Sequence, residues 1–230
     1  MRWAGDRGLL PRRGDDLGYA FHALLTASFG ELAPRPFAVQ QHPRLPAQVL
    51  AYSNHPAVEL REAASLYAEP AAVAALGLPS LVGKAMPEQF TSGQRLGFTV
   101  RVRPTIRTDR EGDRDRVRER DAFLAAVSGI PPGAGPSRGE VYGAWLQGHL
   151  RRGGAEPEQL ALDAFRLEDV QRRDGARALL SQRGPDAAFS GILRVVEPEA
   201  FTALLARGVG RHRSFGFGML LLRPVRSTAC

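Results

Sequence analysis

The sequence predicts an α+β protein made of two halves with similar architecture, and three observations support this prediction. Each half shows a helical segment, two strand-like segments, a second helical segment and a further strand, in that order. The clearest strand, residues 95–103, alternates apolar and polar side chains, as expected of a strand with one buried face. The glycine-rich stretch 208–218 leads directly into a final apolar strand.

The first half is expected to begin with a helix over residues 16–29. Large apolar side chains recur there at every third or fourth position, and Gly30 follows the last of them, which is typical of an amphipathic helix and its end. The remaining elements are two strands, a helical region that Pro70 divides, and the strand described above: residues 36–41, 48–53, 57–76 and 95–103.

The second half is expected to follow a charged tract, residues 103–121, that resembles a linker or mobile loop running into a short helix. Its best-marked element is a helix over residues 197–208, because Pro198 occupies the first turn and Gly208 lies just past the end. The other expected elements are a helix, two strands and a last strand: residues 140–154, 160–173, 187–196 and 215–225.

This order of elements fits two tandem ferredoxin-like (RRM-like) units with antiparallel sheets, each a four-stranded sheet with two helices on one face. We therefore expect one domain over residues 1–108 and a second over residues 109–230. Each unit should begin with a strand before its first helix. Residues 1–3 are the candidates in the first unit, and residues 105–108 are the candidates in the second.

The charge of the chain favours nucleic acid as the partner. The net charge is +7, and Lys84 is the only lysine among 31 basic residues. Arginine forms forked contacts with phosphate and stacks on bases, so nucleic acid is the first expectation and a merely basic surface is the alternative. No apolar run approaches the roughly 20 residues of a membrane span. The single cysteine and the lack of a signal-peptide pattern lead us to expect a cytoplasmic protein.

The sequence lacks the spacings of common metal and nucleotide sites. It contains no CxxC, HExxH, DxDxDG or Walker A pattern, so we expect no metal, no cofactor and no P-loop. A general acid–base site remains, and the first predicted helix offers one. Tyr19 and His22 are three residues apart and share a face. His22 lies at the edge of the apolar stripe, where it is either a group that titrates near neutrality or a structural histidine.

Two groups of basic residues are candidates for binding phosphate. Arg101 and Arg103 are expected on the polar face of the strand, about 7 Å apart, which is close to the spacing of successive phosphates; a solvated outer face is the alternative. The glycine-rich stretch combines Arg211, His212 and Arg213 with glycines, whose backbone N–H groups approach anions closely. A tight connection before a strand is the alternative there.

Residues 208–222 closely resemble the glycine-rich loop and strand of the repeat-associated (RAMP) superfamily of CRISPR RNA-processing endoribonucleases, most of all its CasE-type members. Residues 92–107 resemble a strand motif of this family, with Arg103 where asparagine is usual. Residues 19–29 resemble its first helix, whose histidine, often with a tyrosine three residues earlier, is catalytic in many members. The matches to the loop pattern are Gly208, Gly210, Arg211, Phe215, Gly216 and Gly218.

The resemblance implies binding of a CRISPR repeat stem-loop and one metal-independent cut in the precursor RNA by 2′-OH attack. His22 would be the base or the acid, with Tyr19 assisting. It also implies partner subunits of a CRISPR effector complex. The residues that would bind RNA are Arg101, Arg103, Gly208, Gly210, Arg211, His212, Arg213, Gly216 and Gly218, with Arg151 and Arg152 gripping the stem.

Two other functions remain open from the sequence. The first is a non-catalytic RNA-binding subunit of the same superfamily, with His22 purely structural. The second is a small-molecule enzyme whose glycine loop binds a nucleotide, although the missing Walker residues and the basic charge weaken it.

Overall fold

The computed structural model describes residues 2–10, 17–42, 44–108, 118–131, 133–174 and 177–225. Its C-terminal part has six main elements: β3 (Arg95–Val102), α6 (Arg138–Arg152), β6 (Ala155–Asp174), β7 (Arg177–Val195), α7 (Pro198–Arg207) and β8 (Leu221–Pro224). These four strands form an antiparallel sheet in the order β6-β7-β3-β8. This is the strand order of a ferredoxin-like unit in which β3 comes first in the chain.

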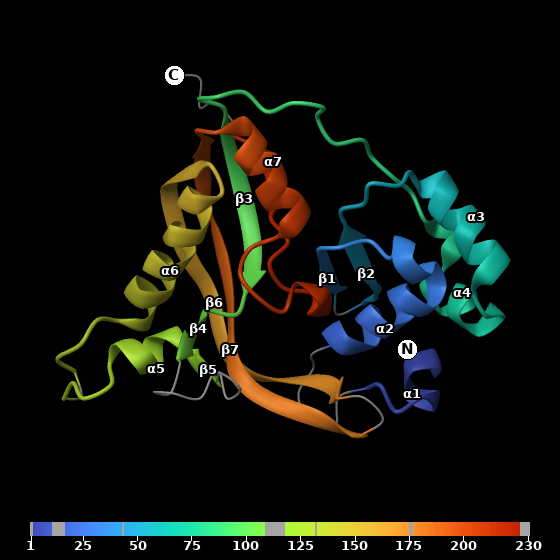
Figure 1. The fold of residues 1–230 in the computed structure, drawn as a ribbon, viewed down its shortest axis with the longest axis horizontal. Helices are drawn as coiled ribbons and strands as arrows, with labels where there is room; N and C mark the ends of the chain where they lie inside the picture. Colours follow the sequence, from blue (N-terminus) through green and yellow to red (C-terminus); the bar gives the residue numbers. More distant parts are fainter. Residues whose placement is uncertain are drawn as a thin grey trace.

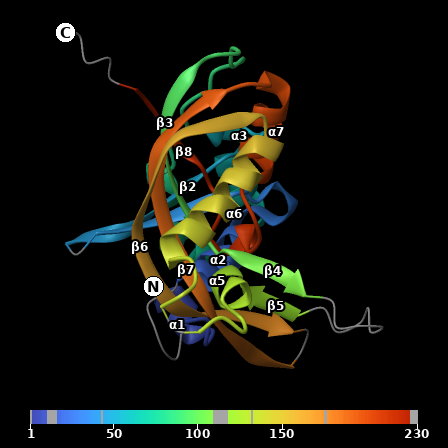
Figure 2. The same ribbon diagram turned by 90° about the vertical axis from the view of Figure 1, so that its left-hand side faces the viewer.

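The core of this unit lies between the sheet and the helices α6 and α7, and Figure 2 shows α6 crossing the face of the sheet. Phe98 and Val100 of β3 are buried against apolar side chains of both helices, among them Leu146 of α6 and Phe201 of α7. The polar Thr99 between the two β3 residues is exposed. The predicted alternation of this strand is therefore confirmed.

The place of β3 in the fold differs from the prediction. We expected it to close the first unit, but it pairs with β7 and β8 and is the first strand of the second unit. The expectation that residues 105–108 begin the second unit is also wrong. They form β4 (Thr105–Thr108), which pairs with β5 (Arg118–Asp121) in a separate two-stranded sheet. Alternation shows which face of a strand is buried but not which strand is its partner.

The strand pairing also bears on the domain boundary. A division after residue 108 would separate β3 from its sheet and β4 from β5. We propose instead that the boundary lies just before β3.

The N-terminal half, which lies to the right in Figure 1, contains a helix–strand–strand–helix arrangement. Its strands β1 and β2 form a two-stranded antiparallel sheet. Arg2 and Trp3, expected in a short first strand, lie in a helix instead, because the Trp3 ring is buried and its indole N–H donates to Glu69 at 2.6 Å. The elements are α1 (Arg2–Asp6), α2 (Gly18–Phe29), η1 (Gly30–Leu32), β1 (Phe37–His42), β2 (Leu45–Ala51), α3 (Ala57–Tyr67), α4 (Pro70–Leu76) and η2 (Leu78–Ser80).

The strands β6 and β7 extend well beyond the part of the sheet that β3 covers. Figure 1 shows this long hairpin curving beneath α2 toward α1, and α2 contacts β6. The two halves of the molecule therefore meet around α2, where the first candidate residues lie.

Residues 135–139 have the Gly-x-Ser-x-Gly spacing of a nucleophile elbow. Ser137 does not follow a strand here. It caps α6 by accepting a hydrogen bond from the backbone N–H of Glu140, whose carboxylate accepts one from the backbone N–H of Ser137. This serine is therefore part of a capping box.

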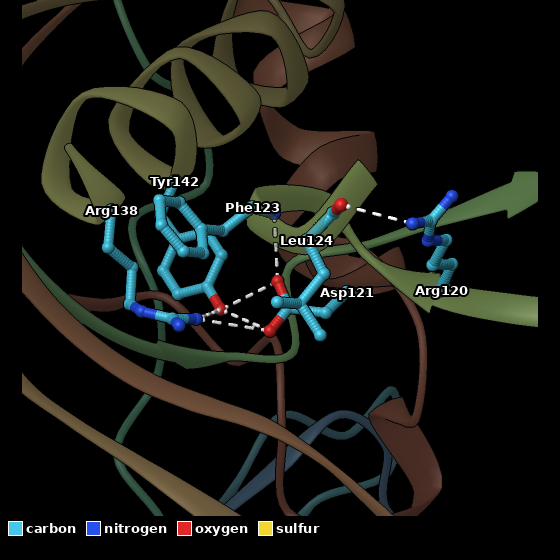
Figure 3. Close-up of polar contacts among 6 residues, drawn as sticks. All are labelled: Arg120, Asp121, Phe123, Leu124, Arg138 and Tyr142. Carbon is cyan, nitrogen blue, oxygen red and sulfur yellow. Dashed lines mark hydrogen bonds and ion pairs between the residues drawn. The ribbon is translucent and has the colours of Figure 1, made fainter. Parts of the chain in front are cut away.

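A polar cluster of Asp121, Arg138 and Tyr142 connects the β4–β5 sheet and α5 (Ala122–Ala126) to α6 (Figure 3). Asp121 caps α5 by accepting from the backbone N–H of Phe123 at 2.8 Å. The buried Tyr142 hydroxyl lies 2.8 Å from both carboxylate oxygens of Asp121, and Arg138 donates to the same hydroxyl at 2.6 Å. Burial, with the Asp121 hydrogen bond and charge, raises the pKa of Tyr142 far above its usual range.

Replacing Tyr142 with phenylalanine should lower the free energy of unfolding by about 1–3 kcal/mol, because it deprives the buried Asp121 of a partner. Chemical denaturation monitored by circular dichroism measures this change. Tyr67→Phe is the matched control, since Tyr67 is 86% exposed. Equal stability of the two variants would contradict the structural role of the cluster.

Candidate functional site

The two predicted halves of the site come from opposite ends of the chain and meet at one aromatic ring. Phe215 ends the 3-10 turn η4 (Arg213–Phe215) of the glycine-rich stretch. Its ring lies edge-on to the His22 ring, with centroids 5.3 Å apart, and 6.1 Å from the Tyr19 ring. The sequence comparison matched Phe215 to the loop pattern but gave it no role. In the structure, Phe215 joins the loop to the helix.

The helix α2 places His22 and Tyr19 at the margin of the core. Phe21 and Leu24 on its inner face are buried, whereas Tyr19 and His22 are only partly buried. Burial, and secondarily the charge of Arg35, lowers the pKa of His22 below its usual 6.5. In the free protein, this imidazole is therefore mainly neutral at pH 7 and able to accept a proton.

The glycine-rich stretch 208–218, hereafter the glycine loop, is closed by its own backbone. The N–H of Val209 donates to the carbonyl of Gly218 at 2.8 Å, and the N–H of Gly218 donates to the carbonyl of Arg101 at 2.7 Å. Gly208 and Gly216 lie against Pro36 and Phe37 of the N-terminal half. The loop is therefore anchored both to the end of β3 and to the segment that begins β1.

Packing within the protein requires glycine at two positions of the loop. A Cβ atom on Gly210 would lie 2.6 Å from the Trp145 ring, and a Cβ atom on Gly218 would overlap the carbonyl oxygen of Val209. Both residues also have positive φ angles, 71° and 79°, which favour glycine. We expected these glycines to allow close approach of RNA, but on this side of each residue the space is filled by protein.

The basic side chains of the loop are held by groups of the same chain. His212 Nε2 lies 2.8 Å from Glu119 Oε2, and the Arg211 guanidinium forms an ion pair with the other oxygen of Glu119. Arg213 donates to the carbonyl of Arg207 at the end of α7, at 2.8 Å. Arg211 is the most exposed of these three basic side chains. Arg213 is therefore engaged as a helix cap and is less open to phosphate than we expected.

Glu119 was not among the predicted site residues. The hydrogen bond from His212, with smaller effects of the Arg211 and Arg103 charges, lowers the pKa of Glu119 despite its burial. It is therefore ionised at neutral pH. It lies in the tract 103–121, where acidic and basic residues alternate so densely that no pattern separates one carboxylate from the others.

Arg101 and Arg103 do not form the open pair that their spacing suggested. Arg103 is only 1% exposed, so its position fits neither the open basic face that we expected nor the solvated outer face that was the alternative. It lies just past β3, where Gly184 leaves space for its guanidinium. Arg101 stacks 4.2 Å from the Phe217 ring and donates to Asp186 at 2.8 and 3.0 Å. Both arginines lie beside the glycine loop, and both guanidinium groups make contacts within the protein, including the one with the Phe217 ring.

Arg151 and Arg152 are exposed in the last turn of α6, and Arg151 pairs with Glu156 at 3.0 Å. This end of α6 lies away from α2 in both views (Figures 1 and 2). The structure thus brings together the helix pair and the glycine loop, and it places these two arginines at an end of α6 that lies away from the helix pair (Figure 1).

Within the described ranges, no group of three or more histidine, cysteine, aspartate or glutamate side chains is arranged to hold a metal ion. None of the described helices is both long enough and apolar enough to span a membrane.

Comparison with known proteins assigns the family. Residues 6–224 match the family described as CRISPR associated protein. The chain belongs to this family. A curated relative, the CRISPR-associated endoribonuclease Cse3 of Thermus thermophilus, is 31% identical over 140 residues. The aligned part covers 57% of this chain and 57% of that relative, so it spans little more than half of the relative's length.

Solved structures extend the likeness to nearly the whole fold. The CRISPR endoribonuclease Cse3 bound to a 19-nucleotide RNA matches with a TM-score of 0.61 and 20% identity, covering 97% of this chain and 95% of that one. A chain of a CRISPR RNA-guided surveillance complex matches with a TM-score of 0.55 and 18% identity, covering 91% and 90%. The predicted α+β class, with antiparallel sheets and the fold of two tandem ferredoxin-like units, is thereby confirmed. The four-stranded sheet expected of the first unit is not, because the described strands of the N-terminal half form the two-stranded sheet β1-β2.

Proposed function

We propose that this CRISPR associated protein binds the stem-loop of a CRISPR repeat and cuts the precursor RNA once, without a metal ion, by attack of a ribose 2′-OH. The observation that carries the proposal is the contact of His22 and Tyr19 with Phe215 of the glycine loop. It places a neutral imidazole beside a loop bearing Arg211 and His212, in a chain whose curated relative is an endoribonuclease.

The chemistry follows from these residues. His22 would remove the proton from the 2′-OH next to the scissile phosphate, and the 2′ oxygen would attack phosphorus. The bond to the 5′ oxygen then breaks, and that oxygen takes up a proton, with the Tyr19 hydroxyl as a candidate donor. The products are a 2′,3′-cyclic phosphate and a 5′-hydroxyl. Arg211 would offset the charge that grows on the phosphate oxygens.

The lowered pKa of His22 favours the base over the acid, two roles that the sequence left open. A base must be unprotonated in the free protein, so kcat/KM should rise with pH and level off, with a midpoint below 6.5. A pH series of cleavage under subsaturating RNA measures this midpoint. A kcat/KM that instead falls between about pH 5 and 7 would assign His22 the acid role.

The proposed function is tested by incubating the protein with labelled repeat RNA in EDTA, beside an RNA with a 2′-deoxyribose at the cut site. Cleavage of the first RNA and survival of the second are expected. Binding of both without cleavage would favour the alternative, a non-catalytic RNA-binding subunit. Absence of RNA binding would overturn both.

We further propose that the protein keeps the processed RNA as a subunit of a CRISPR effector complex in the cytoplasm. This rests on the likeness to a chain of a surveillance complex. Co-purification of the cut RNA with the protein and with the other gene products of its CRISPR system tests it.

A further inference from the structure

A carboxylate from a separate sheet lies among the basic side chains of the glycine loop. Glu119 belongs to β5, which pairs only with β4 among the described strands. Its side chain is 13% exposed, and its two oxygens contact Arg211 and His212. The β4–β5 sheet is held in place by Asp121 and by Trp145, whose indole N–H donates to the carbonyl of Thr105 at 3.1 Å. The position of Glu119 relative to the loop is therefore fixed by the contacts of the β4–β5 sheet with α6.

The residue that Glu119 contacts has an uncommon backbone conformation. Among the described non-glycine residues, His212 alone has a positive φ angle, 59°. For such a residue this conformation costs about 1–2 kcal/mol, and it persists where surrounding contacts fix it. The hydrogen bond to Glu119 is such a contact. It holds the loop at the residue where the turn toward Phe215 begins.

The contacts continue from His212 to the candidate catalytic helix. The carbonyl of His212 accepts the N–H of Phe215 at 2.8 Å, and the two rings lie 6.2 Å apart. Phe215 in turn packs on His22. A chain of direct contacts thus joins Glu119 to His22 through His212 and Phe215.

The same carboxylate opposes RNA binding at the loop. It forms an ion pair with Arg211, the loop cation most open to solvent. A phosphate approaching Arg211 would meet a negative charge in contact with the same guanidinium. Glu119 therefore affects the position of the loop and its affinity for phosphate in opposite directions.

We propose that Glu119 is a positioning residue: it holds His212 and Phe215 in the arrangement that sets His22, and it does so at the expense of RNA affinity. This inference rests on the proposed function. Its signature is a lower cleavage rate combined with tighter RNA binding. A residue that only supported the fold would weaken both when replaced.

The test measures single-turnover cleavage at saturating repeat RNA, together with the dissociation constant, for the wild type, Glu119→Ala and the near-isosteric Glu119→Gln. Glu119→Ala should cleave about 10-fold more slowly and bind at least as tightly, with a salt dependence of log K steeper by about one counterion. Glu119→Gln retains a hydrogen-bond acceptor for His212. It should therefore bind as tightly as Glu119→Ala but cleave at an intermediate rate.

Glu156→Gln is the matched control, because Glu156 pairs with Arg151 at the far end of α6. It should leave the cleavage rate unchanged. Wild-type cleavage in both Glu119 variants, or a loss explained by weaker RNA binding, would overturn the positioning role. Failure of the wild type to bind or cleave repeat RNA would instead overturn the proposed function.

Discussion

His22→Ala should reduce the rate of repeat-RNA cleavage by about 10²–10⁴-fold, the usual contribution of a general acid or base, and leave RNA affinity within about twofold. Affinity should persist because His22 is partly buried on α2 and mainly neutral at pH 7, so its removal takes away little charge. Single-turnover cleavage at saturating RNA separates the two effects.

His55→Ala serves as the control for this variant. His55 lies before α3 and pairs with Glu59 at 2.9 Å, and it contacts neither Phe215 nor the glycine loop among the interactions described. It should cleave at the wild-type rate. A His22→Ala protein that also cleaves at the wild-type rate would return His22 to a structural role and leave the loop arginines as the better candidates for the chemistry.

Gly218→Ala should lower the free energy of unfolding by about 2–4 kcal/mol, through backbone strain and overlap with the Val209 carbonyl. That carbonyl lies in the backbone that closes the glycine loop, so relief of the overlap requires the loop to open. Thermal and chemical denaturation measure the change, and cleavage should decline with it.

Gly93→Ala separates the cost of backbone strain from the cost of overlap with neighbouring atoms. Gly93 has a φ angle of 84°, close to the 79° of Gly218, but no atom lies within 4 Å of the position that its Cβ would occupy. It should therefore cost only the backbone strain of about 1–2 kcal/mol. Equal losses in the two variants would show that the packing of Gly218 adds nothing to stability.

Most elements could be predicted from local sequence because their signals are local. The apolar spacing in α2, the proline and glycine that bound α7, and the division at Pro70 all lie within one or two turns of the elements they define. The position of β3 could not be predicted in this way. Its neighbours β7 and β8 lie far along the chain, and the charged tract that follows β3 resembles a linker.

The residues of the candidate site could be predicted where a residue type at a particular spacing indicates a chemical role. His22, Tyr19 and the loop cations were recognised in this way, and the structure brings His22 and Tyr19 to Phe215. The contacts of Arg103 and Arg213 could not be predicted, because an arginine on a polar strand face or in a loop is expected to be exposed and only the tertiary structure shows what surrounds it. Glu119 was missed for the converse reason, since its role is indicated only by its contacts with Arg211 and His212, which come from a distant part of the chain.

The claim that the first helix and the glycine loop form one catalytic site is tested most directly by a double-mutant cycle between His22 and Phe215. Single-turnover cleavage of repeat RNA would be measured for His22→Ala, Phe215→Leu and the double variant. If Phe215 acts by setting His22, Phe215→Leu should slow the wild type about 10-fold and leave His22→Ala almost unchanged. Rate losses that simply multiply in the double variant would contradict a single shared site.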